Sequence, residues 1–350
     1  MKDYTINDIR NIGIAGHGGT GKTSLAEALL FTAKVTTRLG RVDQGTTVTD
    51  YDEDEIKRKI SINSALAFCD WKGVKINIVD LPGDANFFVD TQFSLLAVDN
   101  AVIVVDGVSG VKVQTQKVWD LAAEYRIPVI FFVNKIEKER ADFFRTQEEI
   151  QKKFSSAVPI QIPIGSETGF SGIVDLIQNK AYEYADDETG LNVEISIPDG
   201  LKEKAKKYRE MLIEKVVETD DSLLEKYLEK GEISDSEMLA ALKKAVSEQR
   251  ISPILCGSAL KNMGVVHLFE VITGLLPSPL FRGKIIGKNS KGEDEVREQS
   301  VIAPFSAFVF KTLVDPHSGH ISLFRVFSGT ANSDLNVINP AEGQNERFGP

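Results

Sequence analysis

The sequence predicts an α/β fold, with a mostly parallel sheet covered by helices on both faces. Short apolar runs alternate with helical patterns over the first 134 residues and again after residue 251. Several of these runs are apolar without interruption, which is typical of strands buried on both faces. A charged helical stretch between the two parts predicts an inserted α+β subdomain. Strand-like segments near the end predict the start of a β-barrel.

The elements of the α/β part follow from the spacing of apolar residues. Leu25, Ala28 and Leu29 recur at the spacing that places them on one face of a helix. Ala101–Val105 is apolar at every position. We predict strands over Asn11–Gly16, Val74–Asp80, Ala101–Asp106, Pro128–Asn134 and Ser252–Gly257, and helices over Lys22–Lys34, Val111–Arg126 and Val265–Leu276.

The pattern changes in the middle of the chain. Strands are predicted over Ala157–Gly165 and in pieces over Gly172–Tyr184, followed by charged helix over Leu201–Gln249. A charged helical face is usually solvated surface. The strand at Ser252–Gly257 resumes the parallel sheet. The predicted organisation is therefore a first part at 1–157, an inserted subdomain at 158–250 and a last part at 251–279.

A second domain is predicted beyond the prolines at 277 and 279, which end the last helix. Lys284–Gln299 is polar and is predicted to be a loop or an exposed hairpin. Strand-like segments follow from Pro304. We assign residues 280–350 to a truncated β-barrel, because about 70 residues are fewer than the roughly 100 of a closed barrel. We therefore expect the chain to be part of a longer protein.

Composition narrows the classes of function. The 350 residues carry 41 Lys and Arg against 51 Asp and Glu, a net charge of −10, which argues against a binder of free DNA. The longest apolar runs are far shorter than the roughly 18 residues of a membrane span, and the charged N-terminus has no signal-peptide core. Cys69 and Cys256 are expected to be buried thiols in a reducing compartment. We expect a cytoplasmic protein without membrane contact.

The strongest motif lies between the first predicted strand and the first predicted helix. It fits G-x-x-x-x-G-K-[ST], in which glycines let backbone N–H groups curl around the β-phosphate of a nucleotide. The lysine reaches the β- and γ-phosphates, the final hydroxyl binds Mg²⁺, and the helix adds its positive end. The residues are Gly16, His17, Gly18, Gly19, Thr20, Gly21, Lys22 and Thr23, with Ser24 next to them.

Two further clusters follow predicted strands. Asp80-Leu81-Pro82-Gly83 ends the strand KINIV, where an acid can hold Mg²⁺ through water and the Gly83 N–H can meet a γ-phosphate. Asn134-Lys135-Ile136-Glu137 ends another strand, and an acid at Glu137 can pair with the N1–H and amine of guanine, which adenine lacks. The stem of Lys135 would pack over the base. Ser258-Ala259-Leu260 follows ILCG and is a candidate to offer a backbone N–H to guanine O6.

These clusters, in this order, resemble those of the translational GTPases, and elongation factor G most closely. The resemblance extends over almost the whole chain and implies a P-loop GTPase domain with an inserted subdomain, a β-barrel domain and three further domains outside this chain. It implies GTP or GDP and Mg²⁺ as ligands, with Thr23, Ser61 and Asp80 holding the metal. The segments that carry it beyond the nucleotide motifs are Gly40-Arg41-Val42 with Gly45 and Asp50, Val158–Gly165 followed by GIVDLI, Cys256–Val265 and Asp315–Thr330.

The chain departs from the family at positions close to the chemistry. The family's D-x-P-G-H ends here in Asp84, and the resemblance implies that the missing histidine would orient the attacking water. Lys22, Gly83 and Asp84 are therefore the candidate catalytic residues, and we predict slow hydrolysis. At the other departures this chain differs from the residue usual in the family. It has Arg58-Lys59-Ile60-Ser61-Ile62 in place of R-G-I-T-I, Gly19 in place of an aspartate, Gly18 in place of a hydrophobic residue, Glu137 in place of an aspartate and Phe93 in place of an arginine.

The prediction is a GTP-binding, elongation factor G-like protein that acts as a monomer at the ribosome. A nucleotide-gated ribosome-binding protein with little catalysis is the alternative, and single-turnover hydrolysis with and without ribosomes separates the two. A P-loop ATPase or kinase is the third class, which competition between ATP and GTP tests.

Overall fold

A computed structural model describes residues 3–289, 291–315, 319–340 and 342–349. Pro316 to Ser318, near the start of the segment Asp315–Thr330, lie outside the described residues, as does Ser290 of the predicted loop or hairpin. The chain divides into two compact units, Met1–Ser278 and Pro279–Pro350.

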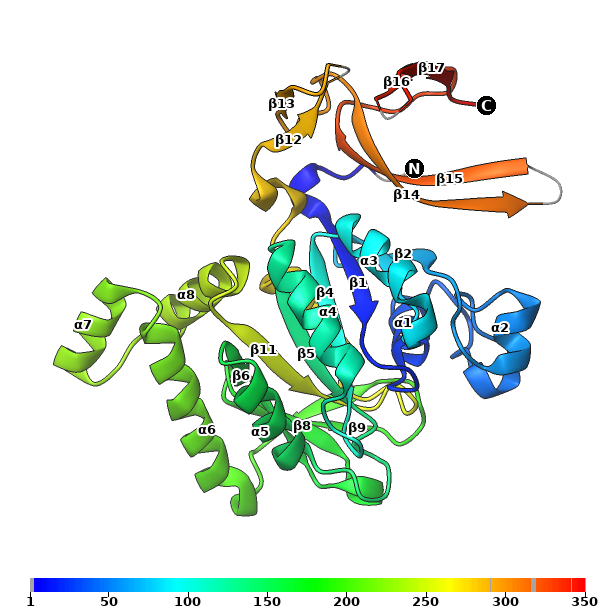
Figure 1. The fold of residues 1–350 in the computed structure, drawn as a ribbon. Helices are drawn as coiled ribbons and strands as arrows, with labels where there is room; N and C mark the ends of the chain where they lie inside the picture. Colours follow the sequence, from blue (N-terminus) through cyan, green and yellow to red (C-terminus); the bar gives the residue numbers. More distant parts are fainter. Residues whose placement is uncertain (1–2, 290, 316–318, 341, 350) are drawn as a thin grey trace. The chain divides into compact units, whose positions relative to one another are not determined.

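A seven-stranded sheet forms the centre of the first unit (Figure 1). Its order is β2-β3-β1-β4-β5-β11-β6, and β2 alone runs antiparallel to its neighbour while the other pairings are parallel. The predicted mostly parallel sheet is therefore confirmed. The strands are β1 (Ile9–Ala15), β2 (Ala65–Trp71), β3 (Val74–Asp80), β4 (Asn100–Asp106), β5 (Val129–Asn134), β6 (Ala157–Pro159) and β11 (Ser252–Cys256).

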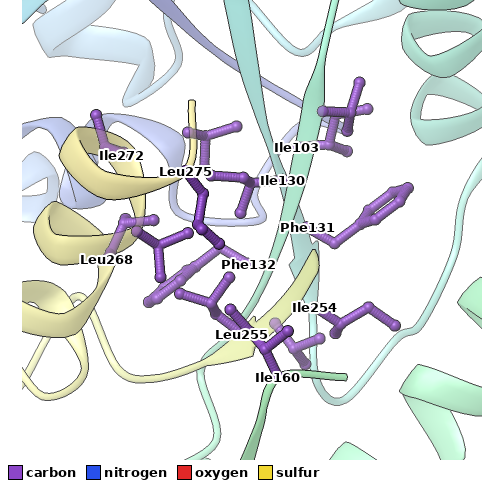
Figure 2. Packing of buried hydrophobic residues seen from close by; sticks show 14 of the residues in the cluster. Ile103, Ile130, Phe131, Phe132, Ile160, Ile254, Leu255, Leu268, Ile272 and Leu275 are labelled. Carbon is purple, nitrogen blue, oxygen red and sulfur yellow. The ribbon is translucent and has the colours of Figure 1, made fainter. Parts of the chain in front are cut away.

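Helices cover both faces of this sheet, because alternate residues of its central strands point to opposite sides. Figure 2 shows Ile130 and Phe132 of β5 on the side of Leu268 and Ile272, with Phe131 on the other side. There Phe131 stacks on Trp119 and Phe154, with ring centroids 5.4 and 5.2 Å away. The helices of this part are α1 (Lys22–Thr32), α2 (Glu53–Arg58), α3 (Phe88–Leu96), α4 (Val113–Glu124), α5 (Phe143–Lys153) and α9 (Val265–Gly274).

The inserted segment builds a second, antiparallel sheet of order β10-β9-β8-β7. The single strand predicted over Ala157–Gly165 is wrong, since it divides at Ile160 into β6 of the large sheet and β7 of the small one. β6 thus spans the predicted boundary between residues 157 and 158. The remaining elements are β7 (Gln161–Ile164), β8 (Gly172–Asp175), β9 (Lys180–Tyr184), β10 (Asn192–Ile195), α6 (Asp199–Val217), α7 (Asp221–Lys230) and α8 (Asp235–Ser247).

The second unit consists of three antiparallel strand pairs, as expected for a β-rich domain. Of the loop and the exposed hairpin predicted as alternatives for Lys284–Gln299, the structure has the hairpin, formed by β12 and β13. Among the described residues the three pairs do not join into one closed sheet. The strands are β12 (Ile285–Lys288), β13 (Asp294–Arg297), β14 (Ser306–Asp315), β15 (Gly319–Ser328), β16 (Asn336–Asn339) and β17 (Gln344–Arg347).

Membrane-spanning helices and disulfide bonds were not expected from the sequence, and the structure bears on both points over the described residues. No described helix combines the length and apolar character that a membrane span requires. Cys69 and Cys256 are buried and unpaired, and burial raises the pKa of the Cys69 thiol to about 12.

Candidate nucleotide-binding site

The glycine-rich loop joins the end of β1 to the start of α1 and curls through left-handed backbone conformations. Gly16, Gly19 and Gly21 have φ values of +139°, +77° and +91°, a region that favours glycine. Gly21 precedes the first turn of α1, and a Cβ added there would lie 2.4 Å from Nδ2 of Asn134. A side chain at this position would therefore displace the loop.

Lys22 lies in the first turn of α1 and is almost completely buried, with 5% of its surface exposed. Its Nζ donates to the carbonyl of His17 at 3.0 Å, so the ammonium points back along the loop. Burial lowers the pKa of Lys22 to about 8, against the attraction of Asp80 and Asp50. An anion in the loop would supply the charge partner that this buried cation needs.

The next residue of α1, Thr23, meets a residue from a distant segment. Its hydroxyl oxygen lies 2.9 Å from that of Ser61. The sequence predicted both as Mg²⁺ ligands, and the structure brings them together. His17 and Ser24 of the same motif are half-buried, while Gly18 and Gly19 are exposed and Thr20 is buried.

Asp80 ends β3 beside these hydroxyls and is 1% exposed. Its Oδ2 accepts a hydrogen bond from Thr49 at 2.9 Å, and its Oδ1 has no partner among the described residues. Burial, followed by the charge of Asp50, raises the pKa of Asp80 to about 7. A divalent cation would satisfy the free oxygen and offset the repulsion between the two acids, so these residues fit Mg²⁺.

No role was predicted from the sequence for Thr49 or Asp50. Asp50 was named only as one of the residues that carry the resemblance to the family. Asp50 is buried, and burial raises its pKa although a hydrogen bond from Ser61 opposes the shift. No local signal in the sequence distinguishes Asp50 from the acids that follow it at positions 52–55. We call residues 40–62, which contain Asp50 and Ser61, the first switch segment.

Gly83 and Asp84 follow β3 on the other side of the loop. A Cβ on Gly83 would lie 2.1 Å from Nζ of Lys22 and 2.8 Å from the Gly18 nitrogen, so the Gly83 backbone packs directly on the loop. Asp84 is half-buried, and its Oδ1 accepts from the N–H of Asn86 at 2.8 Å. Asp84 thereby caps the short 3₁₀ helix Ala85–Phe87.

The cluster after β5 holds the far end of the loop. Asn134 donates to the carbonyl of Thr20 and accepts from the N–H of Ala259, both at 2.9 Å. Lys135 donates to the carbonyl of Gly19 at 2.5 Å and pairs with Asp106 at 2.8 Å. These contacts fix the loop to the strands that would carry the base-recognition residues.

Glu137 is a buried acid without a partner. It is 7% exposed, and neither carboxylate oxygen has a hydrogen-bond partner among the described residues. Two unpaired acceptors on one buried carboxylate are costly unless a ligand supplies donors. The N1–H and amine of guanine are two such donors.

Two of the predicted N–H donors for guanine O6 already bond acceptors within the protein. The N–H of Ser258 donates to the carbonyl of Met263 at 2.9 Å, and that of Ala259 is held by Asn134. Guanine O6 would have to share or replace one of these acceptors. Leu260 is partly exposed and, with Ser24 and Ala259, lines a pocket of 240 Å³. Its remaining walls are residues 40–43 and Lys59 of the first switch segment.

Comparison with known proteins agrees with this geometry. The sequence model of the elongation factor Tu GTP-binding domain matches residues 7–278. The crystal structure of ttk003000868 from Thermus thermophilus is 30% identical and superposes with a TM-score of 0.84, covering 97% of this chain and 48% of that one. The chain thus spans about half the length of that relative. It belongs to the translational GTPases, the family that carries the elongation factor Tu GTP-binding domain, and is elongation factor G-like.

Proposed function

We propose that this protein binds GTP and GDP with Mg²⁺ and acts at the ribosome as an elongation factor G-like factor that hydrolyses GTP slowly. The observation that carries the guanine assignment is the buried, unpartnered carboxylate of Glu137. It lies two residues after Lys135, whose ammonium already bonds the glycine-rich loop. Base recognition and phosphate binding therefore share one edge of the sheet.

In this proposal the chain's own residues bind and orient the nucleotide. Loop N–H groups and Lys22 hold the phosphates, while Thr23, Ser61 and Asp80 hold Mg²⁺. The metal, when bound, neutralises charge on the β- and γ-phosphates. Gly83 offers its N–H to the γ-phosphate. The Asp84 carboxylate accepts the backbone N–H of Asn86, and this motivates the slow rate.

We propose the domain organisation that the sequence predicts, an inserted subdomain at 158–250 and a truncated β-barrel domain at 280–350, with Val158 and Pro159 of the insert still paired to the large sheet in β6. We place the protein in the cytoplasm as a monomer. The capping role of Asp84 also favours the second candidate, a ribosome-binding protein gated by nucleotide with little catalysis.

Calorimetry in the presence of Mg²⁺ tests the nucleotide assignment. GTP and GDP should bind, with ATP at least about tenfold weaker, or about 1.4 kcal/mol. Glu137→Ala should weaken guanine nucleotides selectively, because two donors on the base lose their acceptors. The matched control is Glu139→Ala, whose side chain is 83% exposed. Equal affinity of the parent protein for ATP and GTP would contradict the assignment.

A further inference from the structure

One loop of the inserted subdomain is bonded to two segments that line the 240 Å³ pocket beside Ser24. This loop, residues 185–191, connects β9 to β10 and is closed at its base by a bond from the Ala185 N–H to the Leu191 carbonyl. We call it the latch loop. None of its residues belongs to the predicted nucleotide motifs.

The latch loop contacts the first switch segment through an ion pair. Nη2 of Arg41 lies 2.6 Å from Oε2 of Glu188. Nη1 of the same guanidinium donates to the carbonyl of Leu260 at 3.0 Å. Arg41 therefore bridges the first switch segment, the latch loop and the Ser258–Leu260 turn. Its planar, rigid fork suits such a bridge better than a lysine would.

A second set of contacts binds the latch loop to the segment after Leu260. Asn262 is fully buried, donates to the carbonyl of Glu188 at 3.3 Å and accepts from Thr32 at the end of α1 at 2.9 Å. Lys261 pairs with Asp186 at 2.8 Å. A Cβ on Gly190 would lie 2.7 Å from Nδ2 of Asn262 and 3.0 Å from its carbonyl oxygen, so the Gly190 backbone packs directly against Asn262.

These contacts close a ring from Glu188 through Arg41, Leu260 and Asn262 back to Glu188. Two members of that ring, Arg41 and Leu260, line the 240 Å³ pocket beside Ser24. The first switch segment between Gly40 and Asp52 forms only one short 3₁₀ turn, Val42–Gln44, so its position depends on such side-chain contacts.

We propose that Glu188 is a positioning residue for guanine nucleotide: it holds Arg41 against the Leu260 carbonyl, and the inserted subdomain thereby slows nucleotide release. The inference rests on the proposed function, because it assigns the 240 Å³ pocket to the nucleotide. Movement of the latch loop frees Arg41 and opens the wall formed by residues 40–43. Through this ring the inserted subdomain can affect nucleotide release without contacting any of the predicted phosphate-binding residues.

The test is the release rate of a fluorescent GDP analogue, chased with excess GDP, from the parent and Glu188→Gln. The variant keeps the size of the side chain and removes its charge. Release should become about three- to fivefold faster, the scale expected for a half-exposed ion pair. Arg41→Gln loses the bond to the Leu260 carbonyl as well as the ion pair, so it should release at least as fast as Glu188→Gln. The double variant should match Arg41→Gln, because the contact of Glu188 with Arg41 is already lost there. Asp187→Asn, in the same loop, should release at the parent rate.

Salt dependence separates positioning from a general loss of structure. Release from the parent should accelerate with ionic strength, whereas release from Glu188→Gln should respond less, and the thermal midpoints should agree. Glu188→Asp should restore part of the slow release. Parent-like release from Glu188→Gln, or equal acceleration by Asp187→Asn, would overturn the inference while nucleotide binding stands. A parent that does not bind the GDP analogue would overturn the proposed function and this inference together.

Discussion

The hydroxyl oxygens of Thr23 and Ser61 lie 2.9 Å apart although 38 residues separate them in the sequence. Thr23 is fixed by the first turn of α1, whereas Ser61 reaches it from the end of the first switch segment. Asp80, with one oxygen unpartnered, ends the neighbouring strand. Two hydroxyls and a carboxylate converging in this way provide the oxygen ligands that Mg²⁺ prefers.

Ser61→Ala is therefore expected to weaken binding of GTP in the presence of Mg²⁺ by about tenfold, or about 1.4 kcal/mol. The loss follows from removal of one metal ligand, so the variant should also need more Mg²⁺ for half-maximal binding. Titration of Mg²⁺ at fixed GTP measures both effects. Ser61→Thr keeps the hydroxyl and should behave as the parent. An unchanged Mg²⁺ requirement in Ser61→Ala would remove Ser61 from the metal site.

Lys22→Ala is expected to lose about a hundredfold or more in affinity for GTP and GDP, or about 2.7 kcal/mol. The reason is that Lys22 is a buried cation at the glycine-rich loop, where its ammonium donates to the His17 carbonyl and lies near Asp80 and Asp50. It is therefore placed to bind phosphate. Calorimetry measures the loss. Circular dichroism should show a folded variant, since the residue lies at the edge of the hydrophobic core. Lys152→Ala, on the exposed side of α5, is the matched control. If Lys22→Ala binds as tightly as the parent, the phosphate-loop assignment is wrong.

The motif residues could be predicted from the sequence because each motif is local: a strand end, a glycine-rich turn and a helix start lie within a few residues. The strand β2 was not predicted. Leu66 and Phe68 are apolar yet exposed at the edge of the sheet, so at these two positions the strand lacks the polar residues that would reveal its exposed face in the sequence. Lys59 ends α2 at φ +57°, where the family pattern has glycine, and no propensity favours lysine there.

Contacts between distant segments could not be predicted. Arg41 and Glu188 are 147 positions apart, and only the folded sheets bring them together. The bond between the Ala259 N–H and the distant Asn134 could not be predicted for the same reason. The division of residues 157–165 between two sheets depends on pairing with β11 and β8, which the local pattern does not contain.

The free energy of unfolding without nucleotide or Mg²⁺ should fall as the pH rises from 5 to 8. Burial raises the pKa of Asp80 from its usual 3.8 to about 7. Because the folded protein then binds the proton more tightly than the unfolded chain, this stabilisation is complete below about pH 4 and is lost as the pH rises through about 7. The contribution of Asp80 is at most about 4 kcal/mol. The pKa values of Asp50 and Glu27 are raised in the same direction.

Urea denaturation at pH 5 and pH 8 measures this effect. Asp80→Asn should reduce the difference between the two pH values and be more stable than the parent at pH 8, because it removes a buried charge. Part of the fall in the free energy of unfolding with rising pH should remain in this variant, because the pKa values of Asp50 and Glu27 are still raised. Asp120→Asn, at an exposed position on α4, should leave the difference unchanged. A parent whose stability is flat or rising over this range would contradict the proton-linked role of Asp80.

The final prediction concerns Asp84 and decides between a catalytic factor and a nucleotide-gated binder. Its carboxylate accepts the Asn86 N–H at 2.8 Å and caps the 3₁₀ helix Ala85–Phe87, while the preceding Gly83 packs on the phosphate loop. An acid at a helix start is stabilised by the helix dipole, so this position is favourable without any part in catalysis. A negative charge beside a γ-phosphate would also oppose the charge on the transferring group.

Intrinsic hydrolysis of GTP should therefore be slow and only weakly stimulated by ribosomes, since catalysis in such sites depends on positioning and electrostatics. Single-turnover assays at saturating GTP, with and without ribosomes, should compare the parent with Asp84→His and Asp84→Asn. Asn keeps the helix cap and removes the charge. A faster hydrolysis with Asp84→Asn alone would therefore identify repulsion between the Asp84 carboxylate and the γ-phosphate as the obstacle. A gain seen only with His would identify the missing imidazole, and the parent would then be a binder whose catalytic group has been replaced. A parent that turns over rapidly on ribosomes, and slows in both variants, would instead make Asp84 a catalytic residue, because neither an imidazole nor a neutral cap would then replace its carboxylate.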